Sequence, residues 1–180
     1  MSGAPIVWRD QYAPFLGAEL EDVAFLSLRN SDTPGVVGSL DEDVIAFSGA
    51  VQLVFEGGRA FYLTWQQETA WEFGLKPLND IWTSWTPHSL DTIHRSNSEA
   101  WESALGGSHL KGVSLYSSDL CEDQSLVIAI AHRCETSEKT STLWISAASG
   151  SNAGPGDDLI VSLDRPPPST GSLIPLGIVQ

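Results

Sequence analysis

Two apolar runs in the first half of the chain flank a short polar turn. Residues 44–55 (VIAFSGAVQLVF) and 60–65 (AFYLTW) are rich in β-branched and aromatic side chains, which favour strands. The glycines at 57–58 can adopt the positive φ angles that tight hairpin turns require. The pattern predicts an antiparallel hairpin that reverses there, with a glycine interruption in its first strand and with Val54 close to Phe61.

A helical pattern follows in residues 96–107. Ser96 and Glu99 have the spacing of a capping box, in which each side chain can accept a hydrogen bond from a free backbone amide. The segment EAWESAL places apolar residues four positions apart, and the Gly-Gly pair after it is typical of a helix end. The sequence therefore predicts one helix near residues 97–105.

The other apolar runs predict further strands. Their β-branched and aromatic content and the polar turns between them are typical of a sheet. These runs are residues 23–28, 109–116, 125–134, 140–148 and 159–163. The first 16 residues contain prolines, and we expect them to be extended. The resulting fold prediction is α+β, mostly antiparallel β-sheet with one or few helices.

The two halves of the chain contain similar segments. GAELEDVAFLSL and GSHLKGVSLYSS lie 90 residues apart, and each leads through a loop to a strand that contains Val-Ile-Ala. The next strand then ends near a tryptophan in both halves, Trp65 and Trp144. The common order of these landmarks predicts that residues 17–84 and 107–162 are two duplicated, pseudo-symmetric halves. Chance similarity between amphipathic strands is the alternative.

The domain prediction rests on length and on a change of composition near the C-terminus. Residues 1–163 are long enough for one domain, and 42% of the chain is apolar, which suffices for a core. The segment DRPPPSTG interrupts this pattern and precedes the apolar SLIPLGIVQ. We therefore expect residues 164–180 to form a Pro-rich segment and an apolar tail, which docks on the domain or on a partner.

The chain is strongly acidic, with a formal net charge of −14. Residues 1–90 contain 12 acidic and four basic side chains, and residues 91–180 contain 11 acidic and five basic ones. Because the excess is spread over both halves, the surface should repel nucleic acid and anionic membranes. It suits either solubility alone or the binding of a basic partner.

No pattern in the chain predicts catalysis, a cofactor or a metal. The four histidines lack metal-ligand spacing, and the phosphate-binding and nucleophile-elbow motifs are missing from the sequence. Cys121 and Cys134 do not form a CxxC motif, and the N-terminus has no apolar signal core. We expect a cytoplasmic protein with reduced thiols and without a membrane span.

An acidic run and a group of tryptophans are the candidate partner-binding residues. The run consists of Asp41, Glu42 and Asp43, and the acidic residues at 19–22 could extend it into a patch. The tryptophans in the irregular region 66–95 are Trp71, Trp82 and Trp85. A solvated surface for the acids and a core position for the tryptophans are the ordinary alternatives.

The general profile is similar to that of bacterial immunity proteins, which are small, acidic, free of catalytic motifs and block the basic active site of a secreted toxin. The similarity is one of profile and not of motif. It predicts a protein without enzymatic activity that binds and neutralises a basic protein such as a toxin or effector. The alternatives are a small-molecule-binding module with a Trp-rich pocket, and an enzyme whose catalytic residues are scattered along the chain.

Overall fold

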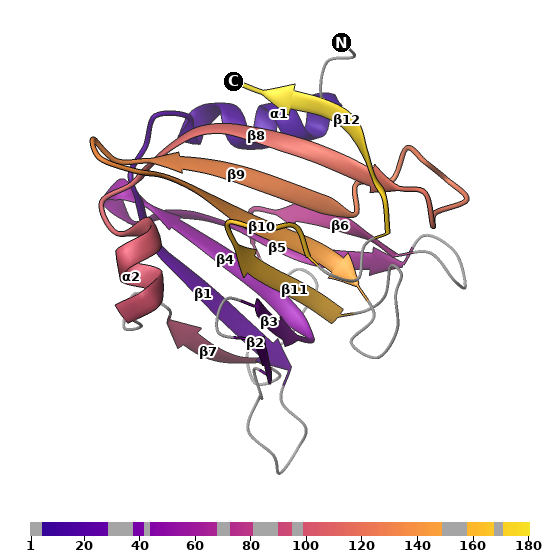
Figure 1. The fold of residues 1–180 in the computed structure, drawn as a ribbon, viewed down its shortest axis with the longest axis horizontal. Helices are drawn as coiled ribbons and strands as arrows, with labels where there is room; N and C mark the ends of the chain where they lie inside the picture. The colour runs from indigo at the N-terminus through magenta and orange to yellow at the C-terminus, as the bar shows by residue number, and fades with distance from the viewer. Residues whose placement is uncertain are drawn as a thin grey trace.

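The computed structural model shows two antiparallel β-sheets packed face to face, with a helix at each of two ends (Figure 1). The structure describes residues 5–28, 38–41, 44–67, 73–80, 90–94, 99–148, 158–167 and 171–180. The prediction of an α+β fold with mostly antiparallel strands and few helices is confirmed.

Every strand pairing in the two sheets is antiparallel. The five-stranded sheet has the order β6-β5-β4-β1-β7. Its strands are β1 (Leu20–Leu28), β4 (Gly49–Phe55), β5 (Arg59–Gln67), β6 (Phe73–Leu78) and β7 (Leu90–His94). The seven-stranded sheet has the order β12-β8-β9-β10-β11-β3-β2. Its strands are β2 (Gly38–Asp41), β3 (Val44–Phe47), β8 (His109–Ser118), β9 (Ala129–Glu135), β10 (Thr140–Ala148), β11 (Asp158–Leu163) and β12 (Leu173–Val179).

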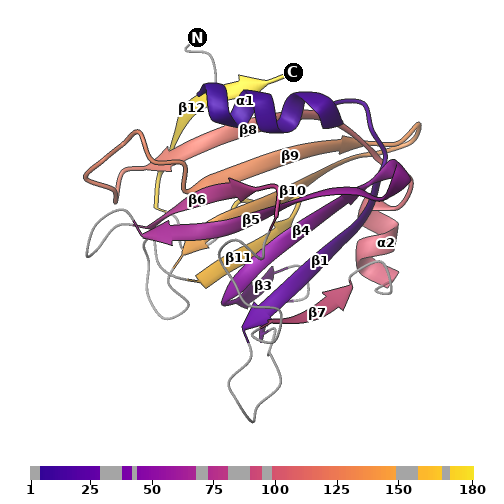
Figure 2. The ribbon, with the colours of Figure 1, turned by 180° about the vertical axis from the view of Figure 1, so that it is seen from behind.

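The described helices are short and lie at the ends of the two-sheet body. They are α1 (Ile6–Tyr12) and α2 (Glu99–Leu105), with 3₁₀ turns η1 (Ala13–Phe15) and η2 (Glu56–Gly58). Helix α1 lies beside β12 at the top of Figures 1 and 2, and α2 lies beside the start of β1. The α2 bounds confirm the helix that the sequence predicts near 97–105.

The core lies between the sheets because alternate residues of each strand point to the same face. Its buried members include Phe25, Leu53, Phe61, Leu115, Ile130, Leu143 and Val161. Trp65 packs against this core, whereas Trp144 lies on the outer face, where its ring centroid is 5.3 Å from that of Tyr116. The two tryptophans therefore lie in corresponding strands, β5 and β10, but their rings pack on different faces of the sheets.

The predicted hairpin is formed by β4 and β5 and reverses at η2. Gly57 and Gly58 have φ angles of 76° and 71°, which side chains with a Cβ rarely adopt. The register pairs Leu53 with Phe61 and Val54 with Ala60. The predicted pairing of Val54 with Phe61 is therefore off by one residue. Phe61 lies opposite Leu53, and both side chains belong to the core.

One continuous run of residues passes from one sheet to the other at Gly49. Strand β3 pairs with β11 in the seven-stranded sheet, and β4 pairs with β1 and β5 in the five-stranded sheet. Gly49 has φ 145°, and a Cβ there would lie 1.9 Å from the carbonyl oxygen of Leu26. The glycine interruption in the predicted strand is therefore the point where β4 begins its pairing with β1 and the backbone lies close to Leu26.

The expectation of an extended N-terminus is wrong, because residues 6–12 form helix α1. Trp8, Tyr12 and Phe15 are buried and recur at helical spacing, a signal that the prolines on either side obscure. Pro5 precedes the first turn, where a missing amide hydrogen costs nothing. The Tyr12 hydroxyl lies 2.6 Å from Nε2 of His132, so the helix is anchored to β9.

The two sheets repeat an order of elements. In the five-stranded sheet, β1, β4, β5 and β6 are successive neighbours, and β7 lies on the other side of β1. In the seven-stranded sheet, β8, β9, β10 and β11 are successive neighbours in the same way, and β12 lies on the other side of β8. Gly17 and Gly107 both have positive φ, and a register shift follows Leu20 in β1 and Leu110 in β8. These correspondences agree with the predicted duplication, which itself stays a prediction.

The apolar tail forms β12, which pairs with β8 at an edge of the seven-stranded sheet. The tail therefore lies against the body. None of the helices in the described ranges is long and apolar enough to cross a membrane.

Replacing Gly49 with alanine should lower the free energy of unfolding by more than about 3 kcal/mol, because the added Cβ meets backbone atoms that cannot move aside. Gly57→Asn is the matched control. Its φ is also positive, but nothing lies within 4 Å of an added Cβ, and asparagine tolerates this region. Urea unfolding of both variants is the measurement, and equal midpoints would contradict the close contact between Gly49 and the backbone of Leu26.

Replacing Tyr12 with phenylalanine should lower the free energy of unfolding by roughly 1–3 kcal/mol, because it leaves a buried nitrogen of His132 without a donor. Tyr62→Phe is the control, since the Tyr62 hydroxyl lies on the half-buried outer face, where it accepts from Gln52 at 3.2 Å. The same loss in both variants would show that the contact with His132 has no special weight.

Candidate functional site

The residues that the sequence nominates for partner binding lie largely outside the described residues. Trp71, Trp82 and Trp85 all fall there, as do Glu42 and Asp43. The backbone of Asp41 is described; it ends β2 and pairs with Val44 of β3. Asp41 thus belongs to an edge strand of the seven-stranded sheet. The roles of the acidic run and of the three tryptophans in partner binding stay predictions.

A different group of acids surrounds a crevice between α2 and the start of β1. The crevice is shallow, with about 20 Å³ of free volume, and its acidic side chains are more exposed than its apolar ones. Its lining consists of Leu20, Glu21, Asp22, Val23, Trp101, Glu102, Leu105 and Gly106. Among these described residues three carry a carboxylate and none is basic. We call this feature the acidic crevice.

A bulge in β1 brings two of these carboxylates to one place. In a regular strand Glu21 and Asp22 would point to opposite faces of the sheet. The register with β4 shifts between Leu20 and Asp22, so Glu21 is the additional residue. Bulges of this kind redirect side chains. Both carboxylates can therefore line the same crevice.

The third carboxylate comes from α2 and depends on the glycine that follows the helix. A Cβ on Gly106 would lie within 2.3 Å of Oε1 and 2.6 Å of the backbone oxygen of Glu102. Only glycine leaves this space, so the Glu102 side chain can fold over the end of α2. The Gly-Gly pair predicts a helix end from the sequence, but its effect on the position of the Glu102 carboxylate is visible only in the structure.

The floor of the crevice is rigid because its aromatic ring belongs to the core. Trp101 is buried, and its ring packs edge-on against Phe25 with centroids 5.7 Å apart. On the other side of α2, the Lys139 ammonium lies 3.4 Å from the carbonyl oxygen of Ser103. The first contact holds α2 against β1 and the second joins α2 to the turn between β9 and β10, so the crevice does not have to form when a ligand arrives.

The acids at 19–22 are predicted from the sequence as a possible extension of the acidic patch. Two of them, Glu21 and Asp22, line the crevice. Their partner Glu102 was missed, because nothing in the sequence states which strand α2 packs against. A weak signal existed: α2 carries Glu99 and Glu102 on its exposed side and no basic residue in its last turn.

The buried groups with reactive side chains are enclosed in the core. Nδ1 of His132 lies 3.1 Å from the carbonyl oxygen of Leu143, which can only accept, so Nδ1 carries the hydrogen and Nε2 accepts from Tyr12. Burial lowers the pKa of His132 to about 4, against the opposing effect of the Leu143 hydrogen bond. Burial also raises the pKa of the Cys134 thiol to about 12. In these positions the two groups contribute to packing and hydrogen bonding.

Within the described residues, no group of three or more His, Cys, Asp or Glu side chains is arranged to hold a metal ion.

The fold and the site define an acidic two-sheet α+β protein with a preformed crevice. The chain matches no protein-family model, and comparisons with curated proteins and with solved structures also found no significant match.

Stability should fall as the pH falls from about 6.5 to about 4, by up to about 3 kcal/mol from His132 alone. The unfolded chain protonates this imidazole near its ordinary pKa, whereas the folded protein keeps it neutral down to about pH 4. The unfolded state therefore binds more protons within this window, and the stabilisation is complete above it.

Urea unfolding of the wild type and of His132→Gln at a series of pH values measures this contribution. Glutamine cannot be protonated, so the difference in unfolding free energy between the two proteins should narrow as the pH falls. Parallel curves across the whole window would show that His132 titrates normally.

Proposed function

We propose that this protein is a small acidic interaction protein that binds a basic protein and neutralises it, in the manner of bacterial immunity proteins. The acidic crevice is the observation that carries the proposal. It combines three carboxylates with a rigid, apolar floor. The charged head of an arginine or lysine side chain can lie against the carboxylates while its aliphatic stem lies across the shallow apolar surface.

The charge of the whole chain supports the same partner. A net charge of −14 attracts a basic surface over a longer range than the crevice itself and repels nucleic acid. Such a field speeds encounter and orients the partner, and salt weakens it over a Debye length of about 8 Å at physiological ionic strength. The predicted contacts at Asp41, Glu42 and Asp43 would extend the acidic surface beyond the crevice.

Affinity should depend on fewer, buried contacts. Interfaces bind mainly through a few desolvated anchors, often arginine or aromatic side chains. An arginine of the partner that lies across the crevice would be such an anchor, with carboxylates beside it. Trp71, Trp82 and Trp85 are our further candidates for anchors. We place the protein in the cytoplasm, where Cys121 and Cys134 would remain reduced thiols inside the fold.

The test begins with purification of the partner on immobilised protein from extracts of the source cells, followed by mass spectrometry and binding kinetics. Glu21→Gln with Glu102→Gln should slow association about tenfold at low salt, because two charges at the crevice are lost. It should also speed dissociation, because an anchored cation loses its partners.

Glu122→Gln with Glu138→Gln is the matched control. It removes the same charge at exposed positions that do not line the crevice, so it should leave dissociation unchanged. Equal effects of the two double variants would mean that only net charge matters and that the crevice is not the contact. An acidic partner, or steady turnover of a small molecule by the purified protein, would overturn the proposal.

A further inference from the structure

A second groove lies between α1 and the start of β5, and it shares no residue with the acidic crevice. It is open and has a volume of about 700 Å³. Its lining consists of Val7, Asp10, Gln11, Pro14, Phe15, Arg59, Ala60 and Asn79. One wall is helix α1 with the turn that follows it, and the other wall is formed by β5 and the end of β6. We call it the α1 groove.

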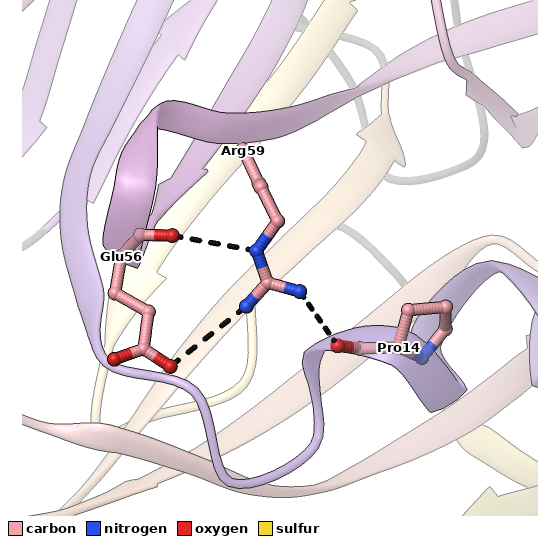
Figure 3. Close-up of polar contacts among 3 residues, drawn as sticks. All are labelled: Pro14, Glu56 and Arg59. Carbon is pink, nitrogen blue, oxygen red and sulfur yellow. Dashed lines mark hydrogen bonds and ion pairs between the residues drawn. The ribbon is translucent and has the colours of Figure 1, made fainter.

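Several polar contacts fix the two walls relative to each other. Nε2 of Gln11 donates to Oδ1 of Asn79 at 3.1 Å, which links α1 to the residue after β6. Nη1 of Arg59 donates to the carbonyl oxygen of Pro14 at 3.1 Å, and its Nε donates to that of Glu56 at 3.3 Å (Figure 3). The same guanidinium lies 3.8 Å from the Glu56 carboxylate. The groove is therefore preorganised.

The rim of this groove exposes apolar side chains that the fold does not use. Val7 is 60% exposed and its neighbour Ile6 is 67% exposed, and they are two of the four large apolar side chains that the described residues leave open to solvent. Phe15 and Ala60 continue the apolar surface into the groove. Exposed apolar surface with a polar rim is typical of an interaction site.

The charges around the α1 groove are balanced, unlike those of the chain as a whole. Arg9 lies 3.7 Å from Asp10, and Arg59 pairs with Glu56, so these four charges cancel. Two of the nine basic residues of the chain are found here. A second copy, itself at −14, would be repelled by most of the surface and least by this region.

We propose that the α1 groove is the contact between two copies of this chain, related by a two-fold axis. Asp10 lies on the α1 wall and Arg59 on the β5 wall. A two-fold axis that runs along the groove places the α1 wall of each copy opposite the β5 wall of the second copy. Asp10 of each copy then faces Arg59 of the second copy, and Val7 of each packs towards Phe15 and Ala60 of the other. Self-complementarity of this kind is what an isologous interface requires.

The occupant is a second copy rather than an unrelated basic protein because the groove has no excess of negative charge to attract one. Little reorganisation is needed on association, since Arg59 is already held by backbone oxygens and by the ring of Phe15, 5.4 Å from its centre. Dimerisation leaves the acidic crevice accessible, because α2 and α1 cover different ends of the molecule (Figure 2).

Sedimentation equilibrium of the purified chain over a series of concentrations tests the proposal. The wild type should form a dimer. Asp10→Arg and Arg59→Asp should each weaken it at least about tenfold, because each places like charges opposite one another twice. An equimolar mixture of the two variants should restore a dimer, since opposite charges then face each other at both contacts.

Two further variants control for effects on folding and on total charge. Val7→Asp changes a side chain that is mostly in solvent, so it should keep the wild-type melting curve and still abolish the dimer. Glu138→Arg makes the same change of charge as Asp10→Arg at an exposed turn outside the groove and should retain the dimer. A wild type that stays monomeric at every concentration, a dimer that survives Val7→Asp, or folded charge variants that fail to associate when mixed would each overturn the proposal.

Discussion

The hydrogen bond between Tyr12 and His132 joins the first helix of the chain to the middle of the seven-stranded sheet. It is short and buried, and the Tyr12 ring also packs edge-on against Phe61 of the five-stranded sheet, with centroids 5.0 Å apart. A single side chain thus contacts both sheets. The chain continues from Tyr12 into η1, where the ring of Phe15 packs against those of Phe55 and Phe61. In the same turn, the carbonyl oxygen of Pro14 accepts a hydrogen bond from Arg59. The α1 groove is a consequence of this one anchor.

The sheets are also connected through their backbones. Leu20 donates to the carbonyl of Ser108 and Leu110 donates to the carbonyl of Ala18, so β1 and β8 start side by side before they separate into different sheets. Farther along, the chain passes between the sheets at Gly49, and the amide of Leu75 in β6 donates to the carbonyl of Val127 just before β9. These connections make the two sheets one cooperative unit, so a substitution that strains one junction should destabilise both sheets.

The candidate interaction surfaces differ in charge because they differ in the elements that form them. The acidic crevice collects carboxylates from a bulge and from a helix end, both of which depend on local backbone geometry at Glu21 and Gly106. The α1 groove instead pairs each acid with a base across short distances. An acidic protein can in this way attract a basic partner at one end and still meet its own copy at the other.

The sequence by itself determined the local structure wherever one pattern was strong. The alternation around Gly57 and Gly58 predicts the β4–β5 hairpin, and the spacing in EAWESAL predicts α2. The apolar run at 140–148 predicts the strand β10. The sequence pattern missed α1, because Pro5 and Pro14 flank a helix of only seven residues. Backbone propensity and side-chain periodicity are properties of neighbours in the chain, so they can be read from it.

Only the tertiary structure decided which of these elements meet. That β3 and β4 belong to different sheets depends on the close approach of Gly49 to Leu26, residues that no local pattern connects. Likewise, the sequence favoured acids that are adjacent in the chain at 41–43, whereas the crevice joins Glu21 and Asp22 to Glu102 from the other half. Total charge is fixed by composition, but its concentration at one place requires packing between distant segments, and the energy of that packing comes from the shared core.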